Sequence, residues 1–283
     1  MDKKGEIIMA KKLKTGGAYL FLIISCIFTI GPMIFLLLLS LRTKQDIVRE
    51  GVLSIPDILH FENYIEAWKT GHFSTYFSNS IVISVLSVIG VVVFSTLIAY
   101  AMVYFDFKGK KMINILVLLG LIIPVEIVII PLFYNMKFVG LLGTRAPVYL
   151  THIALNIPFS VFLLQGFVKD IPKSLVESAR IDGAKEFTIL RKVIAPLIVP
   201  ALVSLVILIF MWTWNDFMTS NIMLKDDAVR TLPLGLSFFK GKYSRDIPMT
   251  ASASTIIMTP VLLVYLVFQK YMIKGLTMGA VKE

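Results

Sequence analysis

Six long stretches of this sequence are almost free of charge, and they constrain its fold more than any other feature. The first, residues 15–41, lies between Lys14 and Arg42. The other stretches are residues 70–105, 112–136, 146–168, 193–215 and 247–269, and the one charged residue within any of them is Glu126. About 20 apolar residues cross the roughly 30 Å of hydrocarbon in a bilayer, so every stretch is long enough. The pattern predicts an all-α membrane protein with six transmembrane helices.

The composition supports a membrane protein and excludes most soluble classes. Hydrophobic residues make up 57% of the 283 residues and charged residues 16%, whereas soluble domains have about 25% charged residues. The chain could not cover a water-exposed surface with so few charges, which excludes an ordinary soluble enzyme and a disordered segment. The single cysteine, Cys26, and three distant histidines predict neither an internal disulfide nor a metal site.

The distribution of Lys and Arg predicts the orientation. Four segments, residues 1–18, 106–111, 168–196 and 270–283, hold 17 of the 28 basic residues, and they alternate with segments that hold the other 11. Basic residues concentrate on the cytoplasmic side of a membrane, so both termini are predicted to be cytoplasmic. The net charge of +10 is then a consequence of topology, and we expect no nucleic-acid partner.

These observations predict one transmembrane domain, residues 19–283, after a cytoplasmic segment 1–18. The expected spans are about residues 19–41, 80–104, 112–134, 147–168, 197–215 and 251–273. The first span is longer than the roughly 7–15 apolar residues of a secretion signal and has no small-residue cleavage site. We therefore expect a retained anchor there.

The cytoplasmic segment 170–196 has the pattern of two short amphipathic helices. Ser174 and Glu177 have the spacing of a capping box, and Asp182-Gly183 is expected to end the first helix with Gly183 at positive φ. The apolar residues expected on one face are Leu175, Val176 and Ala179 in the first helix and Ala184, Phe187, Leu190 and Val193 in the second. Two interpretations are open: a loop that lies on anionic headgroups, or a helix that docks into the groove of a cytoplasmic partner.

The same segment resembles the EAA loop of ABC importer permeases. The resemblance is carried by Glu177-Ser178-Ala179, Asp182-Gly183-Ala184 and Ile194-Ala195-Pro196. Motifs elsewhere extend it over nearly the whole chain: Phe61-x-Asn63-Tyr64, Phe77-x-Asn79-Ser80, Trp214-Asn215-Asp216-Phe217 and Gly275-Leu276-Thr277-x-Gly279-Ala280-Val281-Lys282. Together they are similar to sugar permeases of the maltose-transporter, MalG-like type. Ser178 replaces an Ala of the family pattern, and Glu283 stands where the family commonly ends in Gly.

The resemblance implies a type I ABC importer permease fold with a cytoplasmic coupling helix between the fourth and fifth spans. It implies a homologous second permease, two ATP-binding subunits and an extracytoplasmic solute-binding protein as partners, in the lipids of the cytoplasmic membrane of a prokaryote. The residues that would meet the ATPase subunits are Glu177, Ser178, Ala179, Asp182, Gly183 and Ala184, and in the tail, residues 274–283, Gly279, Ala280, Val281 and Lys282.

The sequence contains no G-x-x-x-x-G-K-[ST] phosphate-binding loop. We therefore expect that this chain is not an enzyme and binds no cofactor, and that the partner subunits use ATP and Mg²⁺. A membrane-embedded enzyme would need paired carboxylates, a His–nucleophile arrangement or metal ligands at membrane depth, and the sequence offers none of these patterns. A non-transport scaffold, and a permease for an amino acid, phosphate or polyol, are the alternatives to a sugar permease.

The candidates for the translocation pathway are Glu126, Asn156, Trp214 and Asn215. An acid at membrane depth faces a cavity or a partner, so Glu126 has two interpretations. Asn156 could bind sugar hydroxyls or join helices, and Trp214 could stack on a sugar ring or anchor at the interface. The expected function is the import of a sugar or oligosaccharide by alternating access.

Overall fold

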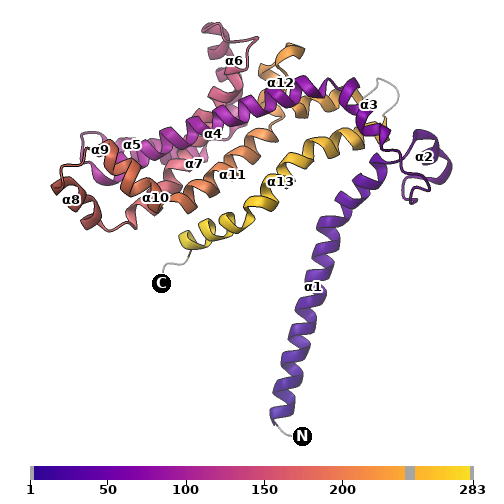
Figure 1. Ribbon diagram of the computed structural model, residues 1–283, viewed down its shortest axis with the longest axis horizontal. Coiled ribbons are helices and arrows are strands. Elements are labelled where there is room, and N and C mark those ends of the chain that lie inside the picture. The colour runs from indigo at the N-terminus through magenta and orange to yellow at the C-terminus, as the bar shows by residue number, and fades with distance from the viewer. Residues whose placement is uncertain (1–2, 240–245, 281–283) are drawn as a thin grey trace. The chain divides into compact units, whose positions relative to one another are not determined.

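The computed structural model describes residues 3–239 and 246–280, and the regular structure of these residues is helical throughout. The chain forms two compact units, Met1–Gly71 with Leu236–Ile256, and His72–Gly235 with Ile257–Glu283. The helices of the first unit are α1 (Lys3–Ser40), α2 (Lys44–Glu50) and α3 (Glu62–Thr70), together with the start of α13 (Ile247–Ala280) (Figure 1).

In the first unit, buried polar side chains organise the turn that follows α1. Arg42 is fully buried, and its guanidinium donates to the carbonyls of Gly51, Ser54 and Asp46 at 2.7, 3.1 and 3.0 Å. The amide of Asn63 donates to the carbonyls of Ser40 and Arg42 at 2.9 and 2.8 Å. The Phe61-x-Asn63-Tyr64 motif therefore satisfies carbonyls at the end of α1 that have no partner within the helix.

The second unit is built on three helices that lie side by side: α4 (Phe73–Tyr104), α7 (Ala146–Lys169) and α11 (Val199–Trp214) (Figure 1). Their core includes Val91, Ala99, Leu164, Val168, Ala201 and Leu205, all fully buried. A Cβ at Gly90 would lie 2.3 Å from the Ile153 side chain, so the glycine allows α4 and α7 to approach closely.

The remaining elements of this unit are shorter. They are α5 (Lys110–Ile122), α6 (Val125–Phe138), α8 (Lys173–Ile181), α9 (Glu186–Ile189), the π-helical turn η1 (Leu190–Ile194), α10 (Ala195–Leu197), α12 (Met218–Met223) and the 3₁₀ turn η2 (Asp227–Val229). A further 3₁₀ segment, η3 (Leu232–Phe239), begins in this unit.

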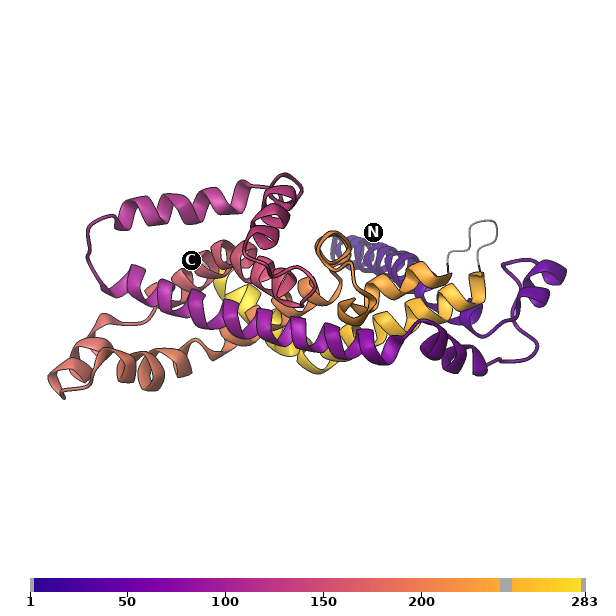
Figure 2. The same cartoon turned by 90° about the horizontal axis from the view of Figure 1, so that it is seen from above.

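One of the six expected spans is bent within its length, and another has a bend at its start. Four helices are long and apolar enough to cross a membrane, Thr15–Ser40, Phe73–Tyr104, Ala146–Lys169 and Ile247–Lys270. The expected third span is divided into α5 and α6, which meet at 108°. The second bent pair, Glu186–Leu197 and Val199–Trp214, meets at 81° where the expected fifth span, residues 197–215, begins. The first bend is visible in Figure 2, where the magenta chain turns sharply. The count is up to six if each bent pair is one span.

Proline explains the position of both bends. Ile123 is extended, with ψ of 115°, directly before Pro124, because a proline disfavours the helical conformation in the residue that precedes it. Pro200 follows the second break, at Ile198. Because proline has no backbone N–H, Pro200 cannot make the helical hydrogen bond to the preceding turn, and the helix is interrupted there. The expected span over residues 112–134 therefore consists of two helices and not of one continuous helix.

Candidate functional site

The connection between α7 and α11, residues 170–198, consists of α8, a glycine turn, α9, η1 and α10. Helix α8 begins at Lys173, directly after an extended Pro172, and no side chain caps its amino end. Ser174 lies inside the helix, where its carbonyl accepts a hydrogen bond from Ser178 Oγ at 2.6 Å. The predicted capping box of Ser174 and Glu177 is wrong, because α8 already begins at Lys173 and its N-cap is Pro172, two residues before Ser174.

The prediction for Gly183 is confirmed. Gly183 has φ of 80°, and the Ala184 N–H closes the turn on the Ala179 carbonyl at 3.0 Å. A backbone hydrogen bond between residues five positions apart, closed around a left-handed residue, is typical of the carboxyl end of a helix. A Cβ at Gly183 would meet no atom within 4 Å, so the requirement for glycine is conformational and not steric.

The apolar residues of α8 divide between two faces. Val176 is buried, and Ala179 and Ala184 pack with it against the core of the second unit. Leu175 is 44% exposed, and Ile181 is 86% exposed. The prediction that Leu175 shares a free apolar face with Val176 and Ala179 is therefore wrong, because tertiary packing covers the other two residues.

The exposed side of α8 is defined by Leu175, Ser178 and Ile181, which succeed one another at three-residue spacing. We call these three residues the α8 patch. Glu177 and Asp182 are exposed beside it. Among the proposed coupling residues, then, Glu177, Ser178, Asp182 and Gly183 are exposed, while Ala179 and Ala184 are half-buried.

An ion-pair cluster holds α8 and α9 to the end of α4. Arg180 donates to both oxygens of Glu186, at 2.8 and 3.2 Å, and the hydroxyl of Tyr100 on α4 donates to the same carboxylate at 2.5 Å. The Arg180 guanidinium also lies 5.9 Å from the centre of the Phe105 ring, which is within cation–π distance. Its hydrogen bond to Glu186 raises the pKa of Arg180, so the pair stays charged. No local sequence pattern indicates this cluster, since its members lie up to 86 residues apart.

The π-helical turn after α9 changes which residues face the core. Ile189, Leu190, Ile194 and Ile198 are buried, whereas Phe187 is 68% exposed. A stripe through Phe187 was predicted from a uniform α-helix, and it is wrong because α9 starts only at Glu186 and η1 inserts a wider turn.

At the opposite end of α11, polar groups are buried. Asp216 accepts hydrogen bonds from the N–H groups of Thr219 and Ser220, at 3.1 and 2.9 Å, and from Ser220 Oγ at 2.8 Å. His152 on α7 lies with Nε2 3.5 Å from the same carboxylate. Asp216 therefore fixes the start of α12 against α7.

Asn79 on α4 ties down the rest of this segment, residues 215–235. It is fully buried, its amide donates to the carbonyls of Ala228 and Arg230 at 2.9 and 2.8 Å, and its oxygen accepts from Arg145 at 2.6 Å. The neighbouring Ser80 accepts the Leu232 N–H at 2.8 Å. The sequence motif Asn79-Ser80 was recognised, but its role as an anchor for a segment about 150 residues away was not.

The four pathway candidates lie in different environments. Trp214 is 2% exposed, its indole donates to the Ile257 carbonyl at 3.1 Å, and its ring packs edge-on against Phe77. This contradicts a pathway or interfacial role, because no face of the ring is available to a ligand or to lipid. Asn215 is exposed and bonds only to the carbonyl of its own helix at Met211.

Glu126 and Asn156 remain accessible in the described chain. Glu126 is exposed in the first turn of α6, directly after the bend at Pro124. Asn156 is half-buried, and its amide donates to the His152 carbonyl one turn earlier at 2.7 Å. No hydrogen bond between described residues joins any two of the four candidates. In the tail, Gly279 and Ala280 end α13, and Val281 and Lys282 lie outside the described residues.

Comparison with known proteins gives a consistent result. Residues 92–277 match the family described as binding-protein-dependent transport system inner membrane component. The arabinooligosaccharides transport system permease protein AraQ of Halalkalibacterium halodurans is 33% identical over 100% of both chains. The trehalose/maltose transport system permease protein MalG of Thermococcus litoralis is 34% identical over 98% of this chain and 99% of its own.

A solved structure supports the fold. A chain of a bacterial ABC transporter involved in the import of the acidic polysaccharide alginate superimposes with a TM-score of 0.78 and 22% identity, over 96% of this chain and 98% of that one. The all-helical arrangement is thus the type I ABC importer permease fold that the resemblance implied.

Proposed function

The chain belongs to the family of binding-protein-dependent transport system inner membrane components, and from this membership we propose that it is the permease subunit of an ATP-driven importer for a sugar or oligosaccharide. One observation carries the choice of substrate. Two relatives that match essentially the whole chain at 33% and 34% identity are both named for the transport of such carbohydrates.

The proposed topology has six spans, with each bent helix pair counted as one. Residues 1–18, the 170–196 connection and the tail 274–283 lie in the cytoplasm, and residues 19–283 form one transmembrane domain in the cytoplasmic membrane of a prokaryote. The bias of Lys and Arg supports this orientation. With Cys26 replaced by Ala, cysteines at Lys110 and Lys185 should react only from the cytoplasmic side, and a cysteine at Lys242 only from outside. Reaction of position 185 from outside would refute the topology.

The proposed partners are a homologous second permease, two ATP-binding subunits and an extracytoplasmic solute-binding protein. The α8 patch is the proposed contact with an ATPase subunit, because Leu175 and Ile181 are exposed apolar residues on a helix outside the expected spans. An amphipathic helix of this kind fits a hydrophobic groove. The tail residues Gly279, Ala280, Val281 and Lys282 are proposed to touch the same subunits, which would hold ATP and Mg²⁺, while this chain binds no cofactor.

The coupling mechanism follows from how α8 is held. Movement of an ATPase subunit would displace α8, and the Arg180–Glu186–Tyr100 cluster would transmit that displacement to α4. The buried Val176 gives α8 a second attachment to the same core. We propose that this rigid connection converts closure of the ATPase pair into the change between inward and outward access.

Glu126, Asn156 and Asn215 remain the proposed pathway residues. Glu126 is the strongest, since an exposed carboxylate beside a bend at membrane depth calls for water, a substrate hydroxyl or a partner group. Glu126→Gln should slow uptake without preventing assembly of the complex. Normal uptake by this variant would remove Glu126 from the pathway.

The proposed function has a direct test. The tagged chain, purified from its native membrane in mild detergent, should bring with it a second permease and an ATPase subunit. Proteoliposomes of that complex should accumulate the labelled oligosaccharide bound by the accompanying solute-binding protein, and only with ATP. Purification without any ATPase subunit would refute the importer, and ATP-driven uptake of a non-sugar solute alone would refute the substrate class.

A further inference from the structure

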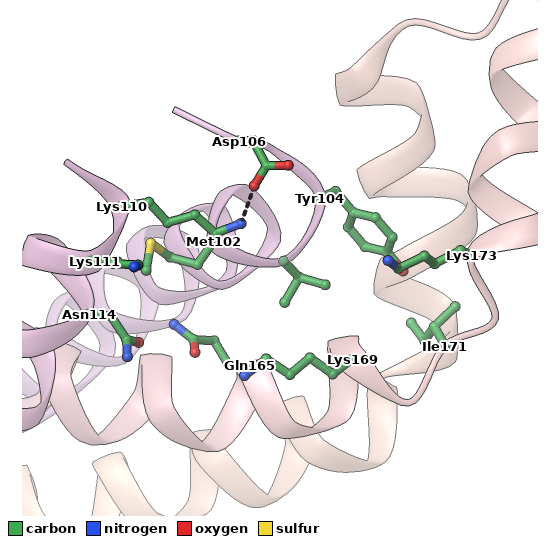
Figure 3. A pocket seen from close by; sticks show the side chains of 11 residues that line it. Met102, Tyr104, Asp106, Lys110, Lys111, Asn114, Gln165, Lys169, Ile171 and Lys173 are labelled. Carbon is green, nitrogen blue, oxygen red and sulfur yellow. Dashed lines mark hydrogen bonds and ion pairs between the residues drawn. The ribbon is translucent and has the colours of Figure 1, made fainter. Parts of the chain in front are cut away.

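A cavity of about 470 Å³ lies where the ends of α4 and α7 meet the start of α5 (Figure 3). Four lysines line it, Lys110, Lys111, Lys169 and Lys173, against a single acid, Asp106. The lysines come from α5, from the end of α7 and from the start of α8. Distant parts of the chain therefore converge on one strongly basic cavity.

Only one of these lysines is neutralised. The Lys110 ammonium donates to Asp106 Oδ1 at 3.0 Å and to the Phe105 carbonyl at 2.8 Å, and Figure 3 shows the first of these bonds. Lys111, Lys169 and Lys173 form no ion pair with a carboxylate of the residues that the structure describes. Like charges around one cavity destabilise one another, so a bound anion would stabilise the arrangement.

A buried amide also lacks a partner at this site. Gln165 on α7 lines the cavity and is 7% exposed, and its Nε2 has no hydrogen-bond acceptor within the described chain. Figure 3 shows its side chain directed toward Asn114 across the cavity. Buried donors are almost always paired, and the oxygens of a phosphate would supply the missing acceptor.

The face of α5 that lines the cavity becomes apolar further along the helix. Leu118 and Ile122 follow Asn114 at four-residue spacing and are both exposed. A ligand whose phosphate occupied the basic cavity could therefore lay hydrocarbon along α5. This pairing of a basic cavity with an exposed apolar helix face fits a phospholipid better than a free phosphate.

We propose that the cavity binds the phosphate headgroup of an anionic phospholipid of the cytoplasmic leaflet, with its acyl chains along α5. The choice of leaflet rests on the proposed topology, which places residues 106–111 and 168–173 on the cytoplasmic side. Basic pockets between membrane helices on that side are suited to anionic headgroups. Lys111, Lys169 and Lys173 would hold the phosphate, and Gln165 would donate to it.

The test measures lipid binding to the purified full-length chain. Native mass spectrometry with dioleoylphosphatidylglycerol should show binding about tenfold tighter than with dioleoylphosphatidylcholine. Lys111→Gln/Lys173→Gln should reduce the affinity for phosphatidylglycerol about tenfold or more, and Gln165→Leu should reduce it severalfold. The matched control, Lys185→Gln/Lys192→Gln, removes the same charge from exposed positions of the same cytoplasmic segment and should bind like the parent.

Three results would overturn the proposal. They are equal affinity for the two lipids, an equal loss in the cavity and control variants, and displacement of phosphatidylglycerol by inorganic phosphate at equal concentration. The last would assign the cavity to a free phosphate. Thermal unfolding of each variant checks that it is folded, and Gln165→Leu provides a second route if the double variant is not. The measurement needs neither ATPase nor sugar, so its failure leaves the transport proposal standing, and failed uptake leaves this one standing.

Discussion

The two segments that flank α11 differ in how their side chains are used. After its carboxyl end, segment 215–235 is fixed by polar side chains, because Asn79 and Asp216 each make three hydrogen bonds within the chain. Before its amino end, the 170–198 connection leaves Leu175, Ile181 and Phe187 exposed to solvent. Phe217 and Met218 are exposed at the first end as well. The difference is therefore that hydrogen bonds within the chain fix the first end, whereas the exposed residues of the second lie on short helices that project from the core.

This difference separates two kinds of mutational effect. A buried donor or acceptor that loses its partner destabilises the folded chain by about 1–3 kcal/mol. An exposed apolar side chain contributes little to the stability of the free chain, but it can dominate binding to a partner. Variants in segment 215–235 should therefore change folding, and variants of the α8 patch should change assembly.

The largest effect is expected for Asn79→Ala. It would leave the Ala228 and Arg230 carbonyls and the Arg145 guanidinium without their partner, so the free energy of unfolding should fall by about 2–4 kcal/mol. Thermal unfolding of the purified chain measures this. Asn215→Ala is the control, because Asn215 is exposed and makes a single bond within its own helix, and it should change stability by less than about 0.5 kcal/mol. Equal effects of the two variants would contradict the distinction.

The next effect is expected for Ile181→Asp, and it should appear only in assembly. A charge in the α8 patch should weaken attachment of the ATPase subunit by about 2 kcal/mol or more, roughly 30-fold, with unchanged thermal unfolding of the isolated chain. Binding of the purified ATPase subunit to immobilised permease gives both numbers. Ile58→Asp, at an exposed residue of the first unit, is the matched control and should bind normally. Full attachment by Ile181→Asp would exclude the α8 patch as the docking surface.

A smaller effect is expected for Gly183→Val. The left-handed conformation at φ of 80° strains a β-branched residue by about 1–2 kcal/mol. The strain falls in the turn between α8 and α9, which the Arg180–Glu186 pair bridges. Substrate-stimulated ATP hydrolysis by the reconstituted complex should drop while membrane insertion stays normal. Gly183→Asn should retain most coupling, since Asn tolerates this conformation. If the Val and Asn variants couple equally well, backbone strain at the turn is not what matters.

Local sequence patterns predicted the features of this fold that are determined by neighbouring residues in the chain. The apolar stretches gave the helices, and Asp182-Gly183 gave a left-handed turn. Two of the predictions that failed depended on distant contacts. Trp214 is a core residue because Ile257, on another helix, accepts its indole N–H, and Leu175 differs from Val176 only because a distant core covers one of them.

The site itself was predicted less completely than the fold. The resemblance located the coupling segment, but not the cluster of Tyr100, Arg180 and Glu186, whose members are brought together only by the packing of α4 against the connection. The bend at Pro124 was also missed, although the proline is visible in the sequence. Counting charge-free residues alone does not register a helix break.

The smallest effect on the fold is expected for Glu177→Ala, and it distinguishes the corrected helix start from the predicted one. A capping box would make this variant about 1 kcal/mol less stable. Helix α8 instead begins at Lys173 without a side-chain cap, which leaves Glu177 as an exposed residue of its second turn. The free energy of unfolding should then change by less than about 0.5 kcal/mol. Attachment of the ATPase subunit should still weaken by several-fold, because Glu177 lies beside the α8 patch.

Ser174→Ala is the control and should change neither the free energy of unfolding nor the attachment of the ATPase subunit. A loss of about 1 kcal/mol in both variants would show that the capping box does form in the protein. A Glu177→Ala chain with unchanged stability and unchanged attachment would restrict the docking surface to its apolar residues.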